Sequence, residues 1–117
     1  MLAALWRWVF RWLGRIVVGF RGFFLWVRTE RALFVLWLVI LVAAFIRGVG
    51  LLNIFVIVIL GVCLMMAEMF NSAIELLCDR VTPGFSQEIK TIKDICAAAV
   101  LVAGLALVVV GAWIIIA

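Results

Sequence analysis

Residues 51–80 read LLNIFVIVILGVCLMMAEMFNSAIELLCDR, and this stretch decides the fold. It starts as an apolar run in which Asn53 is the one amide, and it continues without a proline to its basic end. As a helix it would be about 45 Å long, which exceeds the hydrocarbon thickness of about 30 Å. The sequence therefore predicts a helix that crosses the membrane and protrudes on one side.

The second half of this stretch carries a line of polar side chains. Their spacing of three and four residues puts them within a wedge of roughly 80° on a helix. The members of this acidic stripe are Glu68, Asn71, Glu75 and Asp79. Carboxylates at the edge of a bilayer are costly unless they are paired, face a protein interior or bind a cation. The acidic stripe is therefore the first candidate for a functional site.

Composition limits the class of protein. Of the 117 residues, 71% are hydrophobic, whereas a soluble domain is only about half apolar. The chain lacks histidine, which excludes an imidazole base and a histidine-ligated metal. Its three cysteines are scattered and form no C-x-x-C pair, so neither a zinc site nor a disulfide framework is expected. We expect an all-α integral membrane protein.

Apolar runs and their breaks predict the order of the helices. We expect a single integral membrane domain over residues 1–117, with an N-terminal interfacial amphipathic helix followed by three transmembrane helices. The expected bounds are 1–27 for the interfacial helix and 31–47, 50–80 and 93–117 for the transmembrane helices. Three arginines inside one span would be costly, which favours an interfacial first helix with tryptophans at headgroup depth and arginines toward anionic lipid. The alternative is a plain first transmembrane helix.

Basic side chains indicate the orientation. Nine of the ten lie near the N-terminus or around the polar loop at 80–94, whereas Arg47 stands alone between two apolar runs. The positive-inside rule then puts the N-terminus and this loop on the cytoplasmic side of a multi-pass protein. Because these charges flank segments that require lipid, nucleic acid is not an expected partner.

The residue types of the acidic stripe also indicate a chemistry. Carboxylate and amide oxygens suit Mg²⁺, which usually combines one or two protein carboxylates with substrate phosphates. Lys93 and Asp94 follow the polar loop, and Glu30 precedes the first span. This set fits phosphoryl transfer from a nucleotide to a lipid, with Glu68 accepting the proton of a lipid hydroxyl.

Two other functions remain open from these residues. Polar side chains at this spacing also hold helical bundles together, with Arg80 or Lys93 neutralising the acids. Intramembrane carboxylates also form relays that move ions or protons. The acids cluster near one end of one helix rather than crossing the bilayer, which disfavours translocation.

Three motifs resemble those of a known family. They are E-x-x-N-S-A-I-E-x-x-x-D-R at 68–80, K-D-x-x-A-A-A-V-L at 93–101 and R-T-E-R-A at 28–32. Over about residues 19–117 the chain resembles the prokaryotic diacylglycerol kinases, a family of small trimeric membrane enzymes that includes undecaprenol kinases. The resemblance implies transfer of the γ-phosphate of ATP to a lipid alcohol of the bacterial inner membrane. Diacylglycerol, giving phosphatidic acid, is the expected substrate and undecaprenol the alternative.

The resemblance also implies a role for each matching residue. Glu68 aligns with the general base, and Glu30 and Glu75 align with ligands of Mg²⁺. ATP is the implied co-substrate, and the residues implied to lie around it are Asn71, Glu75, Asp79, Lys93 and Asp94. The family further implies a homotrimeric bundle whose partners are the bilayer, the nucleotide and the lipid alcohol.

Overall fold

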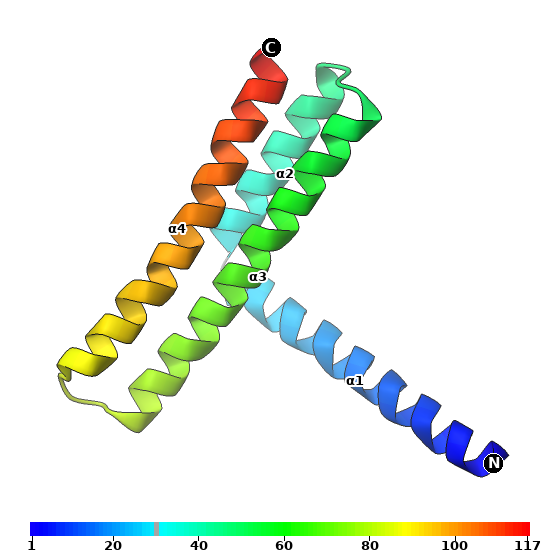
Figure 1. The fold of residues 1–117 in the computed structure, drawn as a ribbon, viewed down its shortest axis with the longest axis vertical. Helices are drawn as coiled ribbons and strands as arrows, with labels where there is room; N and C mark the ends of the chain where they lie inside the picture. Colours follow the sequence, from blue (N-terminus) through cyan, green and yellow to red (C-terminus); the bar gives the residue numbers. More distant parts are fainter. Residues whose placement is uncertain (30) are drawn as a thin grey trace. The chain divides into compact units, whose positions relative to one another are not determined.

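The structure is a computed structural model that describes residues 1–29 and 31–117. Over these residues every regular element is a helix, and Figure 1 shows them in chain order. They are α1 (Leu2–Thr29), α2 (Arg31–Ile46), α3 (Leu51–Val81) and α4 (Gln87–Ile116). Contacts divide the chain into two compact units, Met1–Arg31 and Ala32–Ala117.

Two of the described helices have the length and composition of membrane spans. α3 has 31 residues and α4 has 30, and both are strongly apolar over an 18-residue window. The stretch that runs from α1 into α2 supplies at most one further span, so the described chain has two or three. A multi-pass membrane protein is therefore confirmed, whereas the expected set of three spans stays a prediction.

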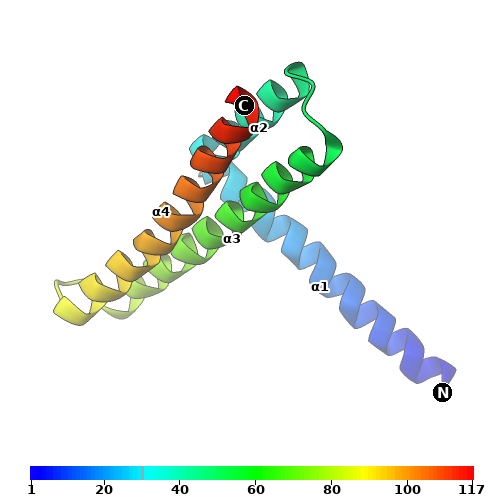
Figure 2. The same ribbon diagram turned by 45° about the horizontal axis from the view of Figure 1, so that its top comes forward.

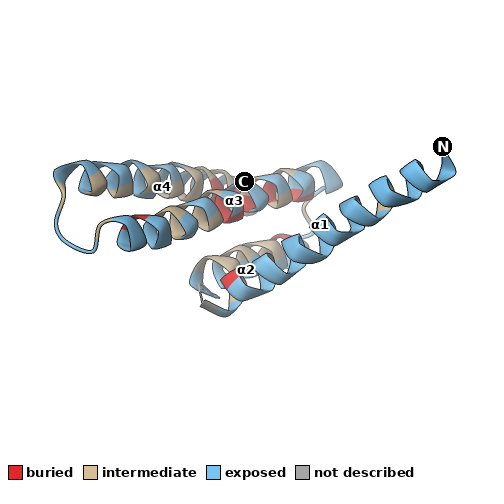
Figure 3. Ribbon diagram, turned by 90° about the horizontal axis from the view of Figure 1, so that it is seen from below, coloured by how far each residue is buried: buried red, intermediate tan, exposed pale blue. Residues whose placement is uncertain are grey.

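Within the second unit, α2, α3 and α4 lie side by side. Figures 1 and 2 show α3 running antiparallel to both of its chain neighbours, α2 and α4. Buried residues gather on α3, as Figure 3 shows, while most of α4 is exposed. The fully or nearly fully buried core consists of Ala44, Ile54, Ile57, Leu64 and Leu107. All three helices contribute residues to this core, so one apolar face of each helix packs against the other two.

A close contact between α2 and α3 occurs at Gly61. The indole of Trp37 lies directly over this glycine, where a Cβ atom would overlap the ring. Its Nε1 donates a hydrogen bond to the carbonyl oxygen of Ile57, at 3.2 Å. Because glycine has no side chain, the ring reaches the backbone of α3 and satisfies its own polar group there.

The turn between α2 and α3 lies at the same end of the bundle as the C-terminus. Gly48 takes a left-handed conformation with φ of 69°, which glycine adopts without steric cost. Beside it, Arg47 Nε donates a hydrogen bond to the carbonyl oxygen of Ile115, at 3.1 Å. The arginine that stands alone in the sequence therefore ties this turn to the last turn of α4.

The connection between α3 and α4 is shorter than the sequence indicated. α3 ends at Val81 and α4 begins at Gln87, six residues before the expected boundary at 93. Ser86 has extended backbone angles and its Oγ accepts a hydrogen bond from the backbone N–H of Ile89, at 3.5 Å. A serine N-cap before Gln87 explains the earlier start, since it satisfies one of the free N–H groups of the first turn.

Candidate functional site

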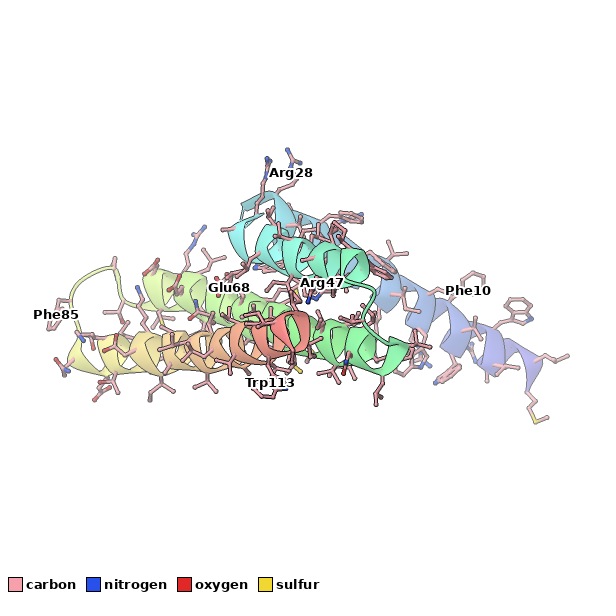
Figure 4. All side chains as sticks on the ribbon, turned by 90° about the horizontal axis from the view of Figure 1, so that it is seen from above. Phe10, Arg28, Arg47, Glu68, Phe85 and Trp113 are labelled. Atoms are coloured by element: carbon pink, nitrogen blue, oxygen red, sulfur yellow. The ribbon has the colours of Figure 1, made fainter. Side chains whose placement is uncertain are left out.

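The acidic stripe lies on a single continuous helix. Glu68, Asn71, Glu75 and Asp79 all belong to α3, so their spacing puts them on one face over about 16 Å. Glu68 and Asn71 are half-buried, whereas Glu75 and Asp79 are exposed. Figure 4 shows Glu68 on α3 between the loop that carries Phe85 and the turn that carries Arg47. The stripe thus runs from the middle of the helix to its loop end.

One ion pair links the acidic stripe to α4. Lys93 Nζ lies 2.6 Å from Asp79 Oδ1, so the structure brings these two predicted site residues together. The side chains keep 36% and 66% of their surface exposed. An exposed pair of this kind contributes little to stability, because water solvates both charges when they separate. It nevertheless holds an amine beside the carboxylates of α3.

A second ion pair lies within α4 and engages Asp94. Lys90 Nζ lies 2.6 Å from Asp94 Oδ2, one helical turn away, and both side chains are more than half exposed. Asp94 was expected near the nucleotide; in the structure its carboxylate pairs with Lys90, and its place beside a nucleotide stays a prediction. Lys90 was not among the predicted site residues, although the K-x-x-x-D spacing at 90–94 is the signal that pairs it with Asp94 on a helix.

Asn71 contributes a buried acceptor. Its Oδ1 is shielded from solvent and accepts no hydrogen bond from any of the described residues. A buried amide oxygen without a donor costs free energy, so a donor or a cation from outside the described chain would be favourable there. Glu75 lies one helical turn further along the same face and forms no ion pair within the described residues.

The expected metal site is not assembled from the described residues. Among them, no three carboxylate or thiol side chains converge closely enough to hold a metal ion. Glu30, the expected second ligand beside Glu75, lies outside the described residues. The described residues supply only part of a metal site. They are the carboxylate of Glu75, which forms no ion pair among them, and the buried amide oxygen of Asn71, one helical turn away. Mg²⁺ commonly takes such a set, because phosphates and water complete its shell.

These features define a class of protein. It is a small all-helical membrane protein whose paired helices carry carboxylates, an amide and a lysine at one end of the bundle. A comparison with family models gives the family: the prokaryotic diacylglycerol kinase model matches residues 17–115. The chain belongs to the prokaryotic diacylglycerol kinase family, which confirms the resemblance, and it is a membrane protein of a lipid kinase family. A comparison with curated proteins found no match.

Proposed function

We propose that this protein is an ATP-dependent lipid kinase that transfers the γ-phosphoryl group of Mg-ATP to the hydroxyl of a membrane lipid alcohol. The proposed substrate is diacylglycerol, which gives phosphatidic acid, and undecaprenol is the alternative. The observation that carries the proposal is the juxtaposition of Lys93 with the acidic stripe, at the Asp79 ion pair of 2.6 Å, inside the region that the family matches.

Lys93 is the proposed phosphate-binding residue. Its amine is already held on the face of α3 that carries the carboxylates. Because the pair with Asp79 is exposed, a nucleotide phosphate can replace that carboxylate at small cost. Phosphoryl transfer depends mainly on positioning and charge neutralisation, and a lysine fixed at this point supplies both.

Glu75 and Asn71 are the residues that would hold Mg²⁺ in this chain, with Glu30 as the second carboxylate. The buried, unpartnered Oδ1 of Asn71 and the free carboxylate of Glu75 fit this role, because both are oxygen donors on one face of α3. When bound, the ion would neutralise phosphate charge. Asp79 and Asp94 would lie beside the nucleotide and set the charge around Lys93.

Glu68 is the proposed general base. It is half-buried at the inner end of the acidic stripe, nearest to the apolar half of α3. A lipid hydroxyl that enters from the bilayer side would reach this carboxylate before the more exposed ones. From that position the carboxylate would accept the proton of the hydroxyl as the phosphoryl group is transferred.

A single copy of the chain leaves much of its apolar surface open. Large apolar side chains on α3 and α4 are exposed, among them Phe55, Phe70, Leu101 and Trp113. Lipid covers part of this surface, and further copies of the chain would cover the rest and close the site. We propose a homotrimer in the bacterial inner membrane with a cytoplasmic N-terminus, where ATP is present.

The test is lipid phosphorylation by the purified protein in bicelles, with Mg-ATP and either diacylglycerol or undecaprenol. We expect phosphorylated lipid, and a loss of turnover of about 10²- to 10⁴-fold for Glu68→Gln, the range for a general base. The matched control is Glu88→Gln, the same change on an exposed glutamate in the first turn of α4.

Each outcome of this assay is informative. Full activity in Glu68→Gln would refute the base assignment. A folded protein that phosphorylates neither lipid, but moves ions across proteoliposomes, would refute the kinase proposal in favour of translocation. Phosphorylation of undecaprenol alone would support the kinase proposal, with undecaprenol and not diacylglycerol as the substrate.

A further inference from the structure

Lys90 is a charged side chain that the proposed reaction leaves without a role. It lies at the end of the first turn of α4, and Figure 1 shows this part of α4 beside the last turns of α3. Its Nζ lies 2.6 Å from Asp94 Oδ2, and 55% of the lysine side chain is exposed. Lys93, three residues further along α4, is paired in the same way with Asp79. Two lysines at the loop end of the bundle are therefore each held by one exposed carboxylate.

Helix stability does not account for a lysine at position 90. The positive end of the helix dipole lies at the N-terminus, so a cation in the first turn is disfavoured and an anion is favoured. A lysine four residues before an acid is also the weaker order of such a pair. Because both side chains are more than half exposed, water solvates the charges when they separate. The pair of Lys90 and Asp94 therefore contributes little to the fold and separates at small cost.

The two lysines are neighbours on the surface of α4. Residues three apart on a helix are separated by about 4.5 Å along the axis and about 60° around it, with Cβ atoms about 5–6 Å apart. Each amine already binds an oxyanion, Lys93 across to α3 and Lys90 along α4. Two long side chains that start this close together can reach the same polyanion. A triphosphate, with oxygens along its whole length, can replace both carboxylates at once.

We propose that Lys90 is a second phosphate-binding residue, which leaves Asp94 and binds the nucleotide triphosphate together with Lys93. The ligand class is a nucleoside triphosphate with its magnesium ion, so this role rests on the proposed function. Asp94 is then the carboxylate that holds Lys90 in the absence of nucleotide. The two anions compete for one amine, and the exposed ion pair makes that exchange cheap.

The test measures the dissociation constant of a non-hydrolysable ATP analogue, Mg-adenylyl imidodiphosphate, by calorimetry on the full-length protein in bicelles. Lys90→Met should raise this constant by about tenfold, because a charged hydrogen bond to phosphate is lost. Lys90→Arg should retain most of the affinity, since a guanidinium also donates to phosphate. The unfolding midpoint should not move, because the lost pair is exposed.

Two further variants separate a direct contact from other effects of charge. Arg80→Gln removes one positive charge from the last turn of α3 and should change the constant by less than about twofold, since salt screens exposed charges. Loss of Lys90 also leaves the Asp94 carboxylate without its partner, and that charge would repel phosphate by itself. Lys90→Met is therefore repeated in protein that carries Asp94→Asn. The loss of about tenfold should persist there, because the phosphate contact is lost in either background.

A role for Lys90 in phosphate binding would be refuted if Lys90→Met bound the analogue as tightly as the unmodified protein, or if adding Asp94→Asn restored its affinity. An equal loss in Arg80→Gln would also refute it, because net charge would then be the cause. If Lys93→Met still weakens binding in these cases, the proposed function stands without Lys90. A folded, unmodified protein that neither binds the analogue nor phosphorylates lipid would refute the proposed function, and the role of Lys90 with it.

Discussion

Gly61 offers the sharpest test of how α2 and α3 pack. In Gly61→Ala the new Cβ would overlap the Trp37 indole, so either the ring or the helix must move. Overfilling a packed core costs about 1–3 kcal/mol. If the ring moves, its hydrogen bond to Ile57 is also lost, at about 1 kcal/mol. Alanine recovers about 1 kcal/mol over glycine through helix propensity. The free energy of unfolding should therefore fall by about 1–3 kcal/mol.

Two other glycines provide matched controls for the same substitution. A Cβ at Gly104 would lie 3.8 Å from Leu64 Cδ1, which is an ordinary contact. Gly104→Ala should therefore stabilise the protein by up to about 1 kcal/mol, the propensity gain alone. At Gly111 a Cβ would lie 3.1 Å from Ile40 Cγ2, so crowding should offset most of that gain. The expected order of stability is Gly104→Ala first, Gly111→Ala next and Gly61→Ala last.

The assay is unfolding in mixed micelles titrated with sodium dodecyl sulfate, followed by far-ultraviolet circular dichroism. The midpoints of the three alanine variants and the unmodified protein are compared at one protein concentration. If Gly61→Ala unfolds at the same midpoint as Gly104→Ala or above it, the contact between Trp37 and α3 does not exist in the membrane protein.

Three further predictions concern the site and the far end of the bundle. Lys93→Met should raise the KM for ATP by about 10- to 100-fold, because a charged hydrogen bond to phosphate is lost. The unfolding midpoint should stay nearly unchanged. A large loss of stability with an unchanged KM would mean that the lysine is purely structural. Glu75→Gln should raise the Mg²⁺ concentration for half-maximal activity by about tenfold or abolish activity, and an unchanged requirement would remove Glu75 from the metal site. Arg47→Met should lower the free energy of unfolding by about 1 kcal/mol, because the Ile115 carbonyl loses its donor; no change in the same detergent titration would contradict this.

The existence of the helices was predictable, because apolar runs and the residues that interrupt them are features of the local sequence. The expected bounds 31–47 and 50–80 agree with α2 and α3 to within one residue at each end. The start of α4 was placed too late, since the polar residues after Ser86 suggested a loop. They form instead the solvated first turns of the helix, where Lys90 and Asp94 pair. Polarity alone does not separate a loop from an exposed helix, whereas the serine cap does.

Contacts between helices were not predictable to the same degree. The sequence left open that Lys93 neutralises the stripe, and the structure has it on Asp79. The contact of Trp37 with Gly61 and that of Arg47 with Ile115 had no local signal, because they depend on which helix faces meet. The position of Glu30 lies outside the described residues, so its expected place beside Glu75 stays a prediction.

The packing of the bundle has a direct consequence for the site. On α3 the buried residues lie between Ile54 and Met65, with Cys78 the one addition toward the loop among the described residues. On α4 they are Leu107 and Gly111, at the opposite end from Lys93. About 24 Å of α3 therefore extends past the core, and the acidic stripe occupies this extension.

Sparse packing at that end suits the proposed reaction. A nucleotide must approach from water and a lipid from the bilayer, and a tightly packed bundle end would exclude both. Elements with few buried contacts open at low cost, whereas the core at the far end keeps the helices in register. The exposed pair of Lys93 and Asp79 then joins α3 to α4 without closing the site, and exchanging it for phosphate leaves the core untouched.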